Sequence, residues 1–118
     1  MLAVPDCADA VAWYREALDA AVLWDMGSVA GLSVGGAAVF LHEPVAGNFA
    51  APIDAGVTTA RVELFCDAPE TVIARAVAAG AQGRDVETHE APWGTHRQGG
   101  FTDPFGHVWH VGDRSPLG

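Results

Sequence analysis

The residues best able to do chemistry lie in residues 99–113, near the end of the chain. There Asp-Pro-Phe-Gly, at residues 103–106, has the composition of a tight turn, because proline fixes φ at about −65° and glycine accepts positive φ. The next residues, His107–Val111, are predicted to form a strand whose alternation places Val108 and His110 on one face. An imidazole on such a face can ligate a metal, move a proton or hydrogen-bond a ligand. One face of this strand should therefore carry the function.

Two earlier segments present side chains with the same alternation. Phe40 and His42 alternate on residues 37–42, and Arg61, Glu63 and Phe65 alternate on residues 60–65. A mixture of aromatic, apolar and a few polar side chains is typical of small-molecule pockets. Trp93, in the loop at residues 91–94, is predicted to be an exposed aromatic that stacks on a ligand. The predicted ligand-binding residues are therefore Phe40, His42, Arg61, Glu63, Phe65, Trp93, Val108 and His110.

A metal site built from the same segments is an alternative. His42, Glu63 and His110 supply two imidazoles and a carboxylate, which suit a transition metal if they converge. Histidines on strands are more often hydrogen-bonded wall residues, and Glu63 can instead pair with Arg61. No nucleophile with a neighbouring base and no phosphate-binding loop stands out. We therefore expect no metal, no cofactor and no catalytic residue.

Other residues of the same types are expected to be structural. Solvent-facing positions in loops or at a turn are expected for His89, His96 and His107. Core positions are expected for Trp13 and Trp109. Trp24 is less easily assigned to the core.

These side chains are positioned by a chain that repeats itself at an offset of 61 residues, so that Asp6 corresponds to Asp67. Each copy has a short apolar strand that runs into a helix beginning at the aspartate, with a second acidic residue three positions later that resembles a capping box. Apolar residues spaced three and four apart predict both helices, and Gly80 is a natural end for the second.

After each helix the hydrophobic period changes from 3.6 to 2, and glycines separate short strands. The predicted strands are residues 22–26, 29–34 and 37–42 in the first half, and 84–88, 98–102 and 107–111 in the second. Proline, glycine and alanine between the halves indicate a linker. The predicted fold class is α+β, with two βαβββ modules at about residues 1–45 and 58–118 and a linker at about 46–57, all in one domain.

Composition and charge exclude several classes of protein. The chain has 118 residues, half of them hydrophobic, which is enough for a core. Fifteen acidic residues against six arginines give a formal charge of −9, which argues against nucleic acid and anionic membranes as partners. There is neither a spanning apolar run nor a signal peptide, so we expect a cytoplasmic protein. Cys7 and Cys66 are too few for a disulfide framework and are expected to be free, buried thiols.

The twofold βαβββ pattern is accompanied by three local motifs. They are Asp-x-x-x-Trp-Tyr-Arg at residues 9–15, Ala-Ala-Gly-Ala at 78–81, and Asp-Pro-Phe-Gly-His-x-Trp at 103–109. Together they resemble the vicinal-oxygen-chelate superfamily and, within it, the glyoxalase and bleomycin-resistance proteins. The resemblance implies paired modules whose curved sheets form a cup, usually closed by a second chain in a homodimer. Because this scaffold hosts metal-dependent enzymes as well as drug-binding proteins, it does not by itself give the activity.

The resemblance also implies where metal ligands would stand, on the first and last strands of each module. Carried over to this chain, three of those positions fall on Arg61, Phe40 and His110, and the fourth falls at or before Met1. Of these, only His110 can ligate a metal. Metal chemistry of the family kind is therefore not expected.

We accordingly expect a homodimeric, metal-free protein that binds a small molecule and sequesters or carries it, as in self-resistance to an antibiotic-like metabolite. A planar heteroaromatic natural product, neutral or cationic, fits the aromatic side chains and the negative charge. One alternative is a metal-dependent lyase, isomerase or dioxygenase of the same superfamily. Another is a protein of this fold that has no ligand.

Overall fold

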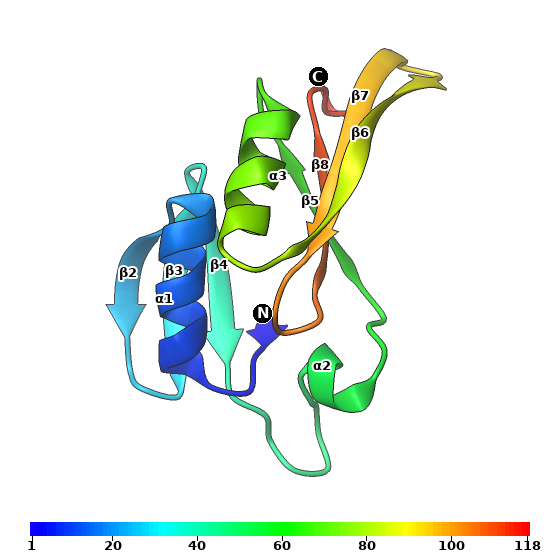
Figure 1. Cartoon of the computed structure of the whole chain (residues 1–118). Coiled ribbons are helices and arrows are strands. Elements are labelled where there is room, and N and C mark those ends of the chain that lie inside the picture. The colour runs from blue at the N-terminus through cyan, green and yellow to red at the C-terminus, as the bar shows by residue number, and fades with distance from the viewer.

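The computed structural model describes residues 1–118 as two βαβββ modules joined by a linker (Figure 1). The first module comprises β1 (Leu2–Ala3), α1 (Cys7–Leu18), β2 (Ala21–Asp25), β3 (Val29–Val34) and β4 (Ala37–His42). The second comprises β5 (Arg61–Phe65), α3 (Pro69–Ala78), β6 (Gln82–Ala91), β7 (Gly94–Thr102) and β8 (Val108–Gly112). The predicted α+β class is confirmed. None of the helices has the length and apolar character needed to cross a membrane.

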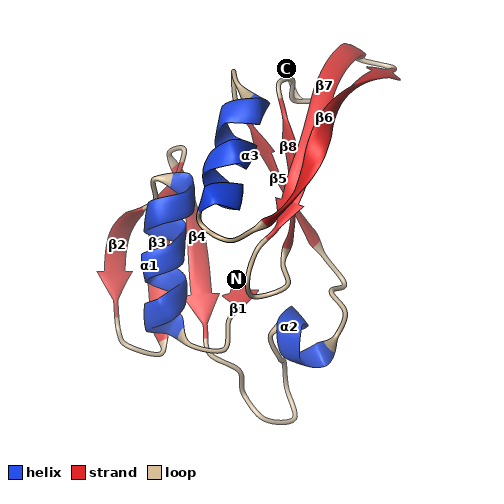
Figure 2. Cartoon of the chain, in the orientation of Figure 1, coloured by secondary structure: helices blue, strands red, loops and turns tan.

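Each module builds a four-stranded mixed sheet with one helix on one of its faces (Figure 2). The strand orders are β1-β4-β3-β2 and β5-β8-β7-β6. In both sheets the first strand of the module pairs in parallel with the last, and the other pairs are antiparallel. Because side chains alternate across a strand, each sheet buries one row against its helix and leaves the other row on the opposite face.

The helices begin in different ways, although the repeat predicted the same start for both. Asp6 caps α1 as expected, since its carboxylate accepts a hydrogen bond from the Asp9 backbone N–H at 2.9 Å. The second helix is not capped by Asp67; α3 begins at Pro69, and Ala68 at its N-cap offers no side-chain acceptor. Proline suits the first helical position because its φ is fixed and it has no N–H to satisfy there. The proline therefore sets the start of α3.

The linker between the modules is more ordered than its composition indicated. It contains a short helix, α2 (Pro52–Ala55), which ends at Gly56 with φ of 79°. The Ile53 backbone N–H donates to the Phe105 carbonyl at 2.9 Å, which ties α2 to the turn before β8. The linker is thus fastened to the second module.

The hairpin β6–β7 is longer than the sequence predicted. Residues 84–88 and 98–102 were expected to be strands, but the ladder continues to a tight turn closed by Ala91 and Gly94. His89 and His96 are therefore strand residues that face each other, and not loop residues. The strand signal was missed because both faces of this arm are largely exposed, so no apolar alternation marks it.

His107 also departs from the expected solvent-facing position. It immediately precedes β8 and is 7% exposed. Its Nε2 lies 2.7 Å from the Ala3 carbonyl oxygen of the first module. The burial of His107 was not predicted because its hydrogen bond joins the two modules, and the sequence around it looks the same as that around an exposed polar turn residue.

The core joins the two modules through aromatic side chains. Trp13 and Trp109 are buried, as predicted, and Tyr14 packs between α1 and β8 with its ring 5.8 Å from that of Trp109. The rings of Phe101 and Trp109 stack at 5.6 Å. Cys7 is buried and Cys66 half-buried, and both are free thiols. The helix side of both sheets is thus one continuous core.

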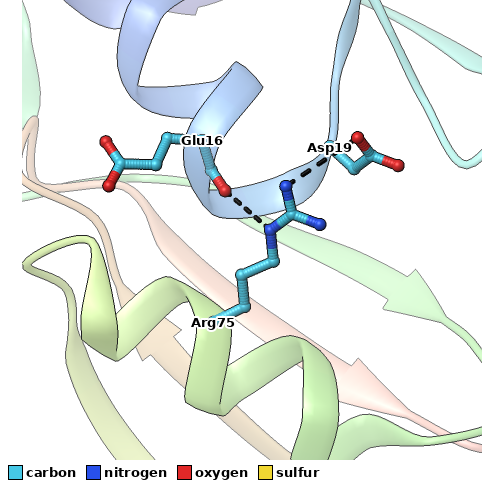
Figure 3. A network of polar contacts seen from close by, with 3 residues as sticks. All are labelled: Glu16, Asp19 and Arg75. Carbon is cyan, nitrogen blue, oxygen red and sulfur yellow. Dashed lines mark hydrogen bonds and ion pairs between the residues drawn. The ribbon is translucent and has the colours of Figure 1, made fainter.

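Polar contacts fix the two helices against each other as well. Arg75 of α3 donates from Nε to the Glu16 carbonyl oxygen at 2.7 Å, and its Nη2 lies 3.8 Å from the Asp19 carboxylate (Figure 3). The Trp13 indole N–H donates to the Ala79 carbonyl at 2.8 Å. These contacts hold the end of α1 beside α3, so the modules have a defined mutual orientation.

A buried carboxylate anchors the Asp-Pro-Phe-Gly turn, with Gly106 at φ of 88° as the sequence predicted. Asp103, 3% exposed, accepts hydrogen bonds on Oδ2 from the Tyr14 hydroxyl at 2.5 Å and the Trp109 indole at 2.9 Å. Its Oδ1 accepts from the backbone N–H groups of Phe105 and His107. Four donors to one carboxylate satisfy a buried charge and link α1 to β8.

The only tyrosine of the chain, Tyr14, reports on this network. Burial raises the pKa of Tyr14 well above its ordinary value of 10.0, and the Asp103 charge adds to the rise. The folded state therefore holds this proton more tightly than the unfolded chain, so the stability it contributes is complete below about pH 10 and is lost as the pH rises further. We expect no phenolate absorbance until the protein unfolds in alkali. Ionisation of Tyr14 at about pH 10 in folded protein would contradict the network.

Candidate functional site

Each sheet has one face that its helix does not cover (Figure 2). Open face 1, on the first sheet, carries Trp24, Gly31, Phe40 and His42. Open face 2, on the second sheet, carries the side chains Arg61, Glu63, Phe65, Arg84, Val108 and His110. The strand alternation predicted for the candidate residues is confirmed, because Leu41 and Trp109, their neighbours in sequence, are buried on the helix side.

Open face 1 presents an aromatic pair. The rings of Trp24 and Phe40 lie 5.6 Å apart, and the two side chains are 38% and 40% exposed. Gly31 lies between them, opposite both residues in the sheet, and a Cβ there would come within 2.5 Å of the Trp24 indole nitrogen. Glycine at this position therefore allows the indole to lie flat on the sheet. His42 stands beside the pair, and its Nδ1 contacts the Glu43 carbonyl oxygen.

Open face 2 presents a group of nitrogen donors. Glu63 and His110 face each other in the parallel pair β5–β8, and an Arg61 Nη1 lies 3.5 Å from His110 Nε2. The ion pair between Arg61 and Glu63, considered as an alternative to a metal site, does not form; the guanidinium turns to the imidazole of the neighbouring strand instead. Because a guanidinium can only donate, His110 Nε2 is the acceptor in this contact.

Arg84 is a residue of this face that the sequence did not reveal. Its guanidinium lies across Gly100 and donates to the Trp109 carbonyl at 2.8 Å, the Phe101 carbonyl at 3.2 Å and Thr102 Oγ1 at 3.2 Å. A Cβ on Gly100 would come within 2.5 Å of the Arg84 Nη2. Arg84 lies beside a bulge between β6 and β7, which shifts the pairing and hid its face from simple alternation.

The charges on open face 2 favour a neutral imidazole. Burial lowers the pKa of His110, the nearby cations of Arg61 and Arg84 lower it further, and Glu63 acts in the opposite direction. Burial also lowers the pKa of the Arg84 guanidinium. The two guanidinium cations beside this imidazole form a local positive region on a protein of net charge −9. Such a region suits a carbonyl or carboxylate oxygen of a ligand.

Two open depressions lie along this face. One, of about 680 Å³, is lined by Arg61, Glu63 and Val108 together with residues 58–60. The other, of about 540 Å³, includes Arg84 and His110 among its lining residues. Arg61, which lines the first, contacts His110, which lines the second, so the two depressions are neighbours on this face.

The family to which the chain belongs follows from its whole length. The profile of the Glyoxalase/Bleomycin resistance protein/Dioxygenase superfamily matches residues 1–111. The chain belongs to this superfamily. The superfamily resemblance of the motifs and of the twofold pattern is therefore confirmed.

Solved structures share the superfamily fold. TioX from Micromonospora sp. ML1 is 25% identical, with a TM-score of 0.72 over 97% of this chain and 94% of that one. A gene product from Arabidopsis thaliana is 24% identical, with a TM-score of 0.72 over 95% and 92%. The fosfomycin resistance protein FosX from Mesorhizobium loti is 13% identical, with a TM-score of 0.70 over 98% and 89%, which shows the fold alone. No curated protein sequence matches the chain at a significant level.

Within this superfamily member, the eight predicted ligand-binding residues divide into three places. Open face 2 brings together Arg61, Glu63, Phe65, Val108 and His110. Phe40 and His42 lie on the other sheet, on open face 1. Trp93 lies at the tip of the β6–β7 hairpin, 41% exposed as expected, with its ring stacked 5.7 Å from that of His96.

The three residues considered for a shifted metal site do not lie on one sheet. Glu63 and His110 are neighbours on the second sheet, whereas His42 is on the first. No group of three or more His, Cys, Asp or Glu side chains in the chain could hold a metal. The donor set of open face 2 also includes two guanidinium groups, which repel a cation.

Proposed function

We propose that this superfamily member is a metal-free, cytoplasmic homodimer that binds a planar heteroaromatic, antibiotic-like metabolite and sequesters or carries it, as in self-resistance. The observation that carries the proposal is that one chain presents both an exposed aromatic surface on open face 1 and nitrogen donors on open face 2. Flat apolar walls and a few orienting polar groups are the usual composition of a small-molecule pocket.

The dimer is supported by strand β2. It is one of the two edge strands of the first sheet and is exposed along its whole length, although its sequence is Ala-Val-Leu-Trp-Asp. Val22 and Leu23 are 41% and 53% exposed. An uncovered apolar edge invites association with another chain, and a twofold arrangement makes the same contact twice. In the proposed dimer, open face 1 of one protomer closes over open face 2 of its partner.

The proposed ligand chemistry follows from the two faces together. Trp24 and Phe40 offer flat rings for offset stacking, which contributes about 0.5–1.5 kcal/mol per aromatic pair beyond burial. Arg61 and Arg84 provide donors for one carbonyl or carboxylate oxygen. The overall negative charge of the protein attracts cations at long range, so a neutral or cationic ring system with one oxygen acceptor fits better than a phosphorylated metabolite.

Fluorescence titration of protein stripped of metal with a chelator tests this proposal. We expect quinoline, acridine or phenazine compounds to quench the tryptophan emission saturably, because Trp24 and Trp93 are exposed and Trp13 and Trp109 are buried. The double substitution Trp24→Phe and Trp93→Phe should remove most of the quenching while calorimetry still detects the compound.

The opposite outcome would favour the enzyme alternative. If no compound of this kind changes the emission or gives binding heat, and the stripped protein instead recovers turnover of a small substrate when zinc, nickel, manganese or iron is returned, the proposed function is wrong.

A further inference from the structure

The outer part of the β6–β7 hairpin carries two imidazoles that the proposed ligand site does not require. His89 and His96 are directly opposed across the antiparallel ladder. Their ring centroids lie 5.6 Å apart, with an angle of 30° between the ring planes. Both come from paired strands, each two residues from the Ala91 and Gly94 pair that closes the tight turn, so the backbone holds their Cβ atoms in a fixed relation.

The hydrogen bonding of this imidazole pair is incomplete. His96 Nδ1 is buried and has no hydrogen-bond partner. Buried side-chain nitrogens in folded proteins nearly always have a partner, so an unpaired one calls for a ligand or an ion. One side of the His96 ring is occupied by the Trp93 indole at 5.7 Å and another by His89.

The spacing of the two rings suits a single metal ion. A metal held at about 2.0–2.1 Å from one nitrogen of each ring keeps the two ring centres roughly 5–6 Å apart. The observed separation of 5.6 Å lies in that range. Imidazole nitrogens bind copper, nickel and zinc, and the general order of affinity places copper(II) first.

A carboxylate stands near the pair as well. Glu87 lies two residues before His89 on β6, so its side chain is on the same face of the hairpin. Glu87 and His89 line the same depression of about 540 Å³. No third His, Cys, Asp or Glu side chain completes a metal-binding group with the pair, so the two imidazoles would leave the other coordination positions to water.

We propose that His89 and His96 form a two-imidazole site for a divalent transition metal, with copper(II) bound more tightly than nickel(II) or zinc(II). The site uses neither His42 nor Glu63 nor His110, and its test does not depend on the proposed small-molecule function. It lies on the hairpin arm and borders open face 2, because His89 lines the same depression of about 540 Å³ as Arg84 and His110.

Titration of the full-length, metal-stripped protein with copper chloride tests the site. Because Trp93 stacks on His96, copper should quench its emission with saturation at one ion per chain. His89→Gln and His96→Gln should each weaken copper binding by at least tenfold. Glu90→Gln, an exposed substitution on the other face of the same strand, is the matched control and should leave the copper affinity unchanged. Trp93→Phe should remove the quenching but not the binding heat.

Electron paramagnetic resonance of the copper-loaded wild-type protein detects the nitrogen ligands of copper(II) without any variant. Nitrogen couplings from two equivalent imidazoles support the site, and their absence overturns it. The proposal is also wrong if His89→Gln and His96→Gln bind copper as the wild type does, or if the wild type shows no saturable binding.

Discussion

Replacing Asp103 with alanine is expected to lower the free energy of unfolding by about 3–5 kcal/mol, because each buried donor left without an acceptor costs about 1–3 kcal/mol. The carboxylate accepts from the side chains of Tyr14 and Trp109 and from two backbone N–H groups. Natural domains have only about 5–15 kcal/mol of total stability. The variant should therefore unfold at a much lower urea concentration or fail to accumulate as folded protein.

Urea unfolding followed by circular dichroism measures this effect. Asp54→Ala removes an exposed aspartate from the short helix α2 and is the matched control, with an expected change within about 0.5 kcal/mol. Tyr14→Phe removes one donor and leaves the carboxylate in place, so we expect a smaller loss than for Asp103→Ala. A loss below about 1 kcal/mol for Asp103→Ala would show that the carboxylate does not hold α1 to β8.

Replacing Arg61 with alanine is expected to weaken binding of a heteroaromatic carboxylic acid that also carries a basic amine, and so is neutral overall, by tenfold or more. A hydrogen bond to a charged group contributes about 1.5–3 kcal/mol, and about 1.4 kcal/mol corresponds to a factor of ten. The Arg61 guanidinium is exposed on open face 2 and its one polar side-chain contact is the long one to His110, so it is free to turn to a ligand. Calorimetric titration of wild type and variant measures the difference.

Two controls separate this effect from a general loss of charge. Arg15→Ala removes the same charge from an exposed position on α1 and should leave the affinity unchanged. The same ring compound without its carboxylate should bind wild type and Arg61→Ala alike. Equal affinity of both proteins for the acid would remove Arg61 from the site.

Much of the fold could be predicted from the sequence because local signals agreed with tertiary structure. Strands β3 and β4 have the predicted bounds, because one face of each strand packs against α1 and the other is open, and this difference produces the apolar alternation in the sequence. The cap of α1 was predicted because a side chain makes it. The start of α3 was not predicted. Asp67, two residues before Pro69, resembles an N-cap in the sequence, but its side chain does not cap the helix.

The candidate site was predictable only where the alternation along a strand shows on which face of the sheet a residue lies. Alternation assigned Arg61, Glu63 and His110 to one face correctly. Arg84 was missed because a bulge changes the phase of β6, and the contact between Arg61 and His110 depends on which strand lies beside β5. The burial of Asp103 requires α1 and β8 together, which no local pattern records.

The most direct test of the proposed function is native mass spectrometry of the purified protein after incubation with a heteroaromatic compound that binds in the fluorescence titration. We predict the mass of two chains plus unmodified compound, and binding of the compound that does not change when a chelator is present throughout. A single chain that carries the compound would contradict the shared pocket. A chemically altered compound, or binding that is lost with the chelator and restored by a divalent metal, would contradict metal-free sequestration.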